Sequence, residues 1–253
     1  QNELTGTAQI AIPAGEELSL FTGSLKITGN VLKRQDGSTQ SITLPSSTSF
    51  LVPAAEQDRE LMLSYTARFT EDTDNLISTE GITLIDTWHP VPDKRMRFSL
   101  SARLPQNFTA IVETDPFPLS DKGETVTAAF SQPVKTLHFA AAPYAVSSLV
   151  VREQLQVHAL FFPEDSALAP GYLAKARDYI LRYEREIGPF PYNHYAIVAN
   201  RLPTGLGMPT FTLLGQAVLR LPFIKDTSLG HEILHSWFGN KVEVAYEQGN
   251  WCE

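Results

Sequence analysis

Two histidines and a glutamate near the end of the sequence have the spacing of a metal-binding helix. His231, Glu232 and His235 belong to the run His-Glu-Ile-Leu-His, so the two imidazoles are four residues apart. On an α-helix such residues lie on one face, one turn apart, and can bind one ion. Glu232 lies about 100° around the helix, where its carboxylate can reach a metal-activated water without acting as a ligand. The pattern predicts a zinc site with His231 and His235 as ligands and Glu232 as general base.

The third ligand has to come from a carboxylate further along the chain. A catalytic zinc ion usually takes three protein ligands and keeps one position for water. The metzincin pattern requires a glycine and a further histidine where this sequence has Phe238 and Lys241, so that class is excluded. Glu243 and Glu247 are expected to be solvated in the loop after the helix. Glu253 follows Asn-Trp-Cys and can open a second, antiparallel helix, so we predict it as the third ligand.

Composition and charge exclude several classes of protein. The 253-residue chain is 43% hydrophobic and 19% charged, as in globular proteins, and its net charge of -8 gives no field that favours nucleic acid. No apolar run approaches the roughly 20 residues of a membrane-spanning helix, so we expect no transmembrane segment. The single cysteine, Cys252, excludes an intramolecular disulfide and leaves the compartment open. Because the sequence starts with Gln1, we expect that an upstream segment was removed, and we favour a periplasmic or extracellular location.

The first 150 residues have the patterns of a β domain. In residues 95–104, Met96, Phe98, Leu100 and Ala102 alternate with arginine and serine, which predicts a strand with one buried face. Shorter β-rich runs occupy residues 18–28, 61–69, 109–113, 125–130 and 136–141. This density of short strands predicts an antiparallel β-sandwich or saddle over residues 1–150.

The remaining residues, 151–253, have a mixed pattern. We predict a strand at residues 155–161, a helix at 170–187 that stops at Gly188, strand-like segments at 195–200 and 210–221, and then the motif helix. Thr227 or Ser228 is expected to cap that helix, and Gly239-Asn240 to end it. Strands first and helices second indicate an α+β multidomain chain with a boundary near residue 150.

Four segments of this second half resemble the aminopeptidase N family of gluzincins. Residues 231–240 are similar to the family's zinc helix, which ends in Trp-x-Gly-Asn. Residues 250–253, Asn-Trp-Cys-Glu, resemble the segment that ends in the glutamate ligand, although the loop before it is one residue shorter than usual. Residues 205–210 resemble the Gly-Ala-Met-Glu-Asn substrate-binding strand, and residues 187–192 match the linker from helix to strand.

The resemblance implies a fold and an activity. It implies an N-terminal β-saddle followed by the first part of a thermolysin-like α/β catalytic domain. It also implies a zinc aminopeptidase that acts on peptides, with one Zn²⁺ ion held by His231, His235 and Glu253. Glu232 would pass a proton from the attacking water to the leaving amine. Gly207 and Met208 would bind the substrate backbone as an edge strand.

The sequence departs from the family in two respects. Pro209 aligns with the glutamate that binds the free α-amine of the substrate, but it has neither a charge nor a backbone N–H; Glu80 or Asp86 is a possible replacement. The family's oxyanion-stabilising tyrosine and its α-helical body lie beyond the glutamate ligand. We therefore expect this chain to be a truncated, nearly inactive part of an active parent.

Two other interpretations remain open. One is a non-catalytic module that binds a peptide or protein and keeps a residual zinc site. The other is a related hydrolase without exopeptidase specificity. The four remaining histidines, His89, His138, His158 and His194, lack the spacing of ligands, and we predict ordinary structural roles for them.

Overall fold

The computed structural model describes residues 2–43, 48–69, 74–122 and 125–242 of the chain. Contacts divide the chain into two compact units. The first unit consists of Gln1–Ser78, Leu84–Arg97 and Gln132–Leu137, and the second of Thr79–Thr83, Phe98–Ser131 and His138–Glu253. These units do not follow the predicted boundary near residue 150, because the chain passes between them several times. The predicted ligand Glu253 lies outside the described residues, as do Glu243 and Glu247.

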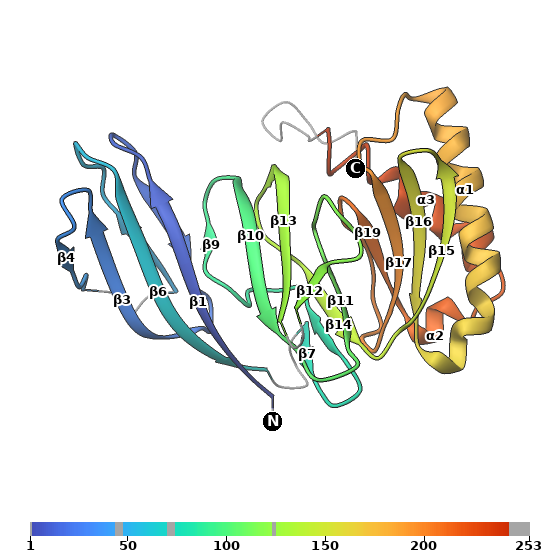
Figure 1. Cartoon of the computed structure of the whole chain (residues 1–253), viewed down its shortest axis with the longest axis horizontal. Coiled ribbons are helices and arrows are strands. Elements are labelled where there is room, and N and C mark those ends of the chain that lie inside the picture. Colours follow the sequence, from blue (N-terminus) through green and yellow to red (C-terminus); the bar gives the residue numbers. More distant parts are fainter. Residues whose placement is uncertain (1, 44–47, 70–73, 123–124, 243–253) are drawn as a thin grey trace. The chain divides into compact units, whose positions relative to one another are not determined.

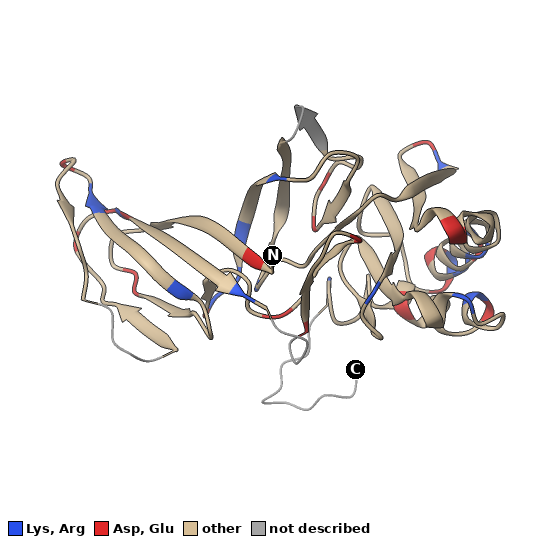
Figure 2. Cartoon of the chain, turned by 90° about the horizontal axis from the view of Figure 1, so that it is seen from below, with Lys and Arg blue, Asp and Glu red and all other residues tan. Residues whose placement is uncertain are grey.

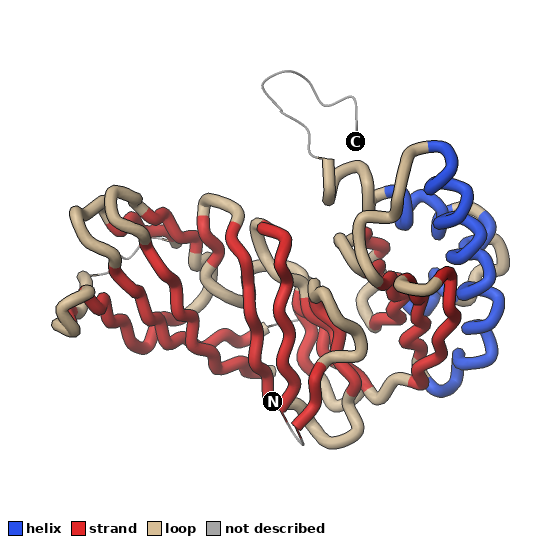
Figure 3. Tube along the Cα trace, turned by 45° about the horizontal axis from the view of Figure 1, so that its top comes forward, coloured by secondary structure: helices blue, strands red, loops and turns tan. Residues whose placement is uncertain are grey.

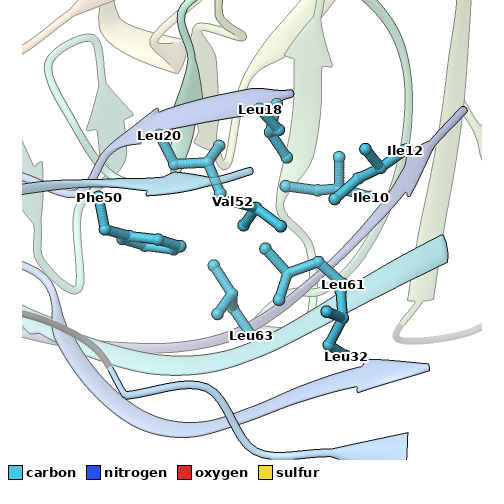
Figure 4. Packing of buried hydrophobic residues seen from close by; sticks show 9 residues of the cluster. All are labelled: Ile10, Ile12, Leu18, Leu20, Leu32, Phe50, Val52, Leu61 and Leu63. Atoms are coloured by element: carbon cyan, nitrogen blue, oxygen red, sulfur yellow. The ribbon is translucent and has the colours of Figure 1, made fainter. Parts of the chain in front are cut away.

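Two antiparallel sheets form the first unit. Their strands are β1 (Glu3–Ile12), β2 (Leu18–Phe21), β3 (Lys26–Arg34), β4 (Thr39–Gln40), β5 (Ser49–Val52), β6 (Arg59–Arg68) and β9 (Val91–Pro92). The strand orders are β1-β6-β3-β4 and β5-β2-β9. Aliphatic and aromatic side chains from both sheets point toward one another and form the core of the unit (Figure 4): Ile10, Ile12, Leu18, Leu20, Leu32, Phe50, Val52, Leu61 and Leu63. This core explains the period-two pattern of the strands that enclose it.

Seven short or medium strands make up two further sheets. They are β7 (Asn75–Ile77), β8 (Ile82–Leu84), β10 (Met96–Arg103), β11 (Thr109–Val112), β12 (Ser120–Lys122), β13 (Thr125–Val134) and β14 (Phe139–Ala142). Their orders are β10-β13-β12 and β11-β14-β8-β7. Along β10 half-buried and exposed residues alternate without a break, so the strand predicted at residues 95–104 is confirmed.

The second unit contains the helices and a five-stranded mixed sheet (Figures 1 and 3). Its elements are β15 (Ala145–Arg152), β16 (Leu155–Phe161), the 3₁₀ turn η1 (Pro163–Leu168), α1 (Ala169–Glu186), β17 (His194–Asn200), β18 (Gly205–Gly207), β19 (Phe211–Gly215), α2 (Gln216–Leu219), the 3₁₀ turn η2 (Ile224–Asp226) and α3 (Ser228–Leu234). The strand order is β15-β16-β17-β19-β18. The central pairs β16–β17 and β17–β19 are parallel, and the outer pairs are antiparallel.

The two faces of this sheet have different neighbours. Successive residues of a strand point to opposite faces, and the ring of Phe161 packs against Tyr172 of α1 with centroids 5.4 Å apart. Odd-numbered residues of β16 and β17, including Tyr195, therefore point toward the helices, and we call this side the helix face. His158 and His194 lie on the opposite side, which we call the far face.

Most elements expected in this unit are present, with one correction. α1 matches the helix predicted at residues 170–187, and residues of both charges lie along it (Figure 2). The strand-like segment predicted at residues 210–221 is wrong in its second half, because β19 ends at Gly215 and α2 follows. A Cβ atom on Gly215 would lie 2.7 Å from the carbonyl oxygen of Leu202, so the chain turns where only glycine fits.

At a coarse level the fold prediction is confirmed, because antiparallel sheets and a few helices make this an α+β protein. Among the described residues, no helix is long and apolar enough to cross a membrane.

Candidate functional site

The short helix α3 brings the two histidines of the motif together. His231 lies in its last turn, and His235 follows as the C-cap residue with helical φ and ψ of -58° and -21°. Nε2 of His235 lies 3.1 Å from Nε2 of His231, and the ring centroids are 4.6 Å apart. The i, i+4 spacing thus places both nitrogens at one point on the surface of the helix, as the sequence predicts.

The geometry of this pair fits a zinc ion. Two nitrogens at the usual Zn–N distance of about 2.0–2.1 Å in a tetrahedral site lie roughly 3.3 Å apart, close to the separation observed. Nδ1 of His235 lies 3.2 Å from the carbonyl oxygen of Phe238. When Nδ1–H donates a hydrogen bond to that carbonyl, the lone pair of Nε2 is free for a metal. Metal-binding imidazoles usually have this orientation.

The described residues supply only these two ligands. No group of three or more His, Cys, Asp or Glu side chains gathers around a common point within the described part of the chain. The predicted third ligand, Glu253, is outside that part, so its role stays a prediction.

Glu232 lies beside the pair on the flank that faces β18. Its side chain is half-buried, and burial raises the pKa of its carboxyl, although the neighbouring His231 and His235 act in the opposite direction. A raised pKa increases the proton affinity of a carboxylate, which favours its use as a general base.

Strand β18 approaches α3 closely, and the approach is tightest at Gly207. Gly205 and Gly207 point toward the helix, while Leu206 between them is 37% exposed. A Cβ atom at Gly207 would lie 3.0 Å from Cβ of His235 and 3.1 Å from both the carbonyl oxygen and Oε2 of Glu232. The predicted substrate strand β18 therefore lies beside the His231–His235 pair, at the edge of the sheet.

The other two predicted substrate residues are more enclosed. Met208 is 3% exposed, and its backbone N–H donates to the carbonyl of Phe211 at 2.8 Å. Pro209 is also buried and supplies no charge. The side chain of Asn240 donates to the carbonyl of Gly207 at 3.3 Å and to that of His235 at 2.9 Å, so it ties β18 to the end of the motif.

Trp237 anchors the motif helix to the linker after α1. Its Nε1 donates to the carbonyl oxygens of Gly188 and Pro189, each at 3.2 Å, and its ring packs against Phe190 with centroids 5.1 Å apart. Gly239 has a φ of +94°, so its predicted left-handed conformation is confirmed, but α3 already ends at Leu234 and the predicted end of the helix at Gly239 is wrong. The resembling segments at residues 187–192 and 231–240 are thus in direct contact.

The predicted side-chain cap of α3 is wrong. Thr227 occupies the N-cap position, but its hydroxyl donates backwards to the carbonyl of Phe223 at 2.9 Å and makes no cap hydrogen bond. The preceding 3₁₀ turn η2 presents that carbonyl, and this competing local bond removes the cap.

Tyr195 was not predicted as a residue of the site, but it lies near Glu232. Tyr195 is completely buried on the helix face of β17, and its hydroxyl has no hydrogen-bond partner among the described residues. Burial and then the charge of Glu232 raise the pKa of this phenol well above its ordinary value. The signal in the sequence was a tyrosine directly before an apolar run in β17.

One of the suggested amine anchors has another partner. Oε2 of Glu80 lies 3.4 Å from Nη2 of Arg201. Asp86 belongs to the first unit, and its Oδ1 accepts a hydrogen bond from Thr87 at 3.3 Å.

A scan against models of protein families finds no match to this chain, and a search of curated proteins finds no similar sequence. Any function proposed for the chain therefore rests on the geometry of the site and on the resemblance of its motifs.

Proposed function

We propose that this chain carries the metal-binding pair and the general base of a zinc-dependent metallopeptidase, and that the enzyme is an aminopeptidase that removes N-terminal amino acids from peptides. The observation that carries the proposal is the pair of Nε2 atoms of His231 and His235, 3.1 Å apart beside a half-buried Glu232. The resemblance to the aminopeptidase N family supports the narrower assignment.

Each residue has a distinct part in the proposed reaction. A zinc ion bound at the pair would supply a Lewis acid that polarises the attacking water and the scissile carbonyl. Glu232 accepts the proton of the water and donates it to the leaving amine. The carbonyl of Phe238 keeps His235 in the orientation in which Nε2 is free. The edge strand β18 aligns an extended peptide along the sheet.

Zinc titration of the chain tests the metal-binding half of the proposal. Metal is first removed from the wild-type chain and from the variant His231→Gln/His235→Gln with a chelator, and both are then titrated with zinc in a calorimeter. The variant should bind one equivalent of zinc less than the wild-type chain. Unchanged stoichiometry in the double variant would refute the site and favour a non-catalytic binding module.

Glu232→Gln is the matched variant for the catalytic half, because it removes the base and leaves both imidazoles in place. In the whole protein it should keep the zinc content and lower the hydrolysis of aminoacyl amides by a factor of about 10²–10⁴. Turnover that survives this change contradicts the assigned role of Glu232.

Substrates with free and blocked amino termini test the exopeptidase assignment. Pro209 provides no charge for the α-amine, so a preference for free amines has to come from another residue. Faster hydrolysis of free-amine substrates supports the aminopeptidase, and equal rates on blocked peptides indicate the related hydrolase with altered specificity.

A further inference from the structure

A second pair of histidines is buried on the far face of the five-stranded sheet. His158 and His194 are each 3% exposed, and their ring centroids are 6.1 Å apart. They lie on adjacent parallel strands, β16 and β17, two residues apart in register. Helix α1 separates the two histidines along the chain, so their spacing in the sequence does not show that they are neighbours.

Three of the four ring nitrogens in this pair have no hydrogen-bond partner. Nε2 of His158 and both nitrogens of His194 are buried and unpartnered within the described part of the chain. The backbone of Asp115 favours the protonated ring of His194 to a small extent without meeting the geometry of a hydrogen bond. Buried polar atoms usually have a hydrogen-bond partner, so three unpartnered nitrogens in one pair of rings point to a bound ligand.

The remaining nitrogen is oriented in the way that a metal ligand requires. Nδ1 of His158 lies 2.8 Å from Oγ of Ser148, which stands opposite it on β15. When the hydroxyl accepts a hydrogen bond from Nδ1–H, Nε2 carries the free lone pair.

Both histidines line a pocket of about 380 Å³ that also contains carboxylates. Asp115 and Glu153 are among its lining residues, with Phe117 packed 4.6 Å from the ring of His158. These carboxylates repel an anion, so the pocket favours a cation.

We propose that His158 and His194 form a binding site for a divalent transition-metal ion of the zinc type, separate from the His231–His235 pair. Imidazole suits zinc, copper and nickel, whereas magnesium and calcium require oxygen ligands. With Zn–N distances of about 2.0 Å, two rings on one ion have centroids roughly 5–6 Å apart, and the observed separation needs only a small adjustment. The two imidazoles are the protein ligands of this site, and water would complete the coordination of the ion.

Metal titration in a chain that lacks the first pair isolates this site. In the variant His231→Gln/His235→Gln, one equivalent of zinc or cobalt should still bind, measured by calorimetry and by the visible absorption of Co²⁺. Adding His158→Gln should abolish that equivalent. The two proposals fail separately. If the variant His231→Gln/His235→Gln binds no metal at all, the His158–His194 site is overturned. If this variant binds as much metal as wild type, the proposed function is overturned.

Ser148→Ala keeps both imidazoles and serves as a second test if the histidine variants do not fold. Removal of the group that orients a ligand lowers metal affinity about 10- to 100-fold. Ser147→Ala, one residue earlier on the other face of β15, is the matched control and should leave the affinity unchanged. Equal affinity in Ser148→Ala and Ser147→Ala contradicts the proposal, as does zinc binding that leaves the imidazole nitrogen resonances of His158 and His194 unshifted.

Discussion

The backbone of Gly207 lies against the side chain of His235 at a distance that leaves little room for a side chain. A Cβ atom at Gly207 would be 3.0 Å from Cβ of His235. Strand β18 and the motif helix α3 are therefore in tight contact at this glycine, beside both His235 and Glu232.

Gly207→Ala should disturb the metal-binding pair. The added methyl would press on His235 and Glu232, so these neighbours have to shift slightly, which we expect to cost about 1–3 kcal/mol of stability and to weaken zinc binding. Thermal unfolding and zinc titration measure both effects. Gly205→Ala is the control, because its Cβ would lie 3.8 Å from Glu232 in ordinary contact. Equal effects of the two changes contradict the close approach.

Gly230→Ala should loosen the packing of α3 on α1. A Cβ atom there would lie 2.7 Å from the ring of Tyr179, so we expect a destabilisation of about 1–3 kcal/mol in the free energy of unfolding. Replacing Tyr179 by alanine in the same chain should recover part of the loss, which a double-mutant cycle measures. Gly171→Ala in α1 meets nothing closer than 3.7 Å and should stabilise the chain by up to about 1 kcal/mol, since alanine favours a helix.

The pair of Glu113 and His138 should make stability depend on pH. Nδ1 of His138 lies 2.6 Å from Oε1 of Glu113, whose side chain is 1% exposed. Burial lowers the pKa of His138, but the charge and hydrogen bond of Glu113 outweigh it and raise the pKa overall. A raised folded pKa stabilises the fold below the unfolded value, near 6.5, and this contribution is lost as the pH rises through the folded pKa.

His138→Gln tests this dependence. The loss of unfolding free energy relative to wild type should be larger at about pH 5.5 than at about pH 9, measured by chemical denaturation at both. A difference that stays constant, or grows with pH, means that His138 is not charged in the folded protein.

Asp165 should hold η1 to α2 at neutral pH. Its carboxylate is 5% exposed and accepts hydrogen bonds from Nε of Arg220 at 2.6 Å and from Nε2 of Gln216 at 2.6 Å. Burial would raise the pKa of Asp165, but these hydrogen bonds lower it. The depressed folded pKa gives a stabilisation that is present above the unfolded value, near 3.9, and lost as the pH falls through the folded pKa.

Asp165→Asn should therefore cost about 1.5–3 kcal/mol at pH 7 and less in acid, measured by denaturant unfolding. Glu164→Gln is the control, since that side chain is 49% exposed and its pairing contributes little. An Asp165→Asn chain as stable as the control would show that the buried carboxylate is not needed.

Much of the site was predictable because it is local. The relation of His231 to His235 follows from helix geometry alone, and the left-handed conformation of Gly239 follows from the conformational freedom of glycine. The strand β10 was equally accessible, because alternation along one segment decides which side is buried. The missing cap at Thr227 and the early end of β19 could not be predicted from the sequence. A competing carbonyl decides the first and a close backbone contact the second.

The sequence alone predicted the arrangement of His231, Glu232 and His235, because their spacing is set within one helix. The residues around this motif depend on the tertiary structure. Gly207 and Tyr195 reach Glu232 through the register of a five-stranded sheet. The same register brings His158 and His194 together. Residues this far apart in the chain meet only where strand pairing places them, and a single sequence does not specify that pairing.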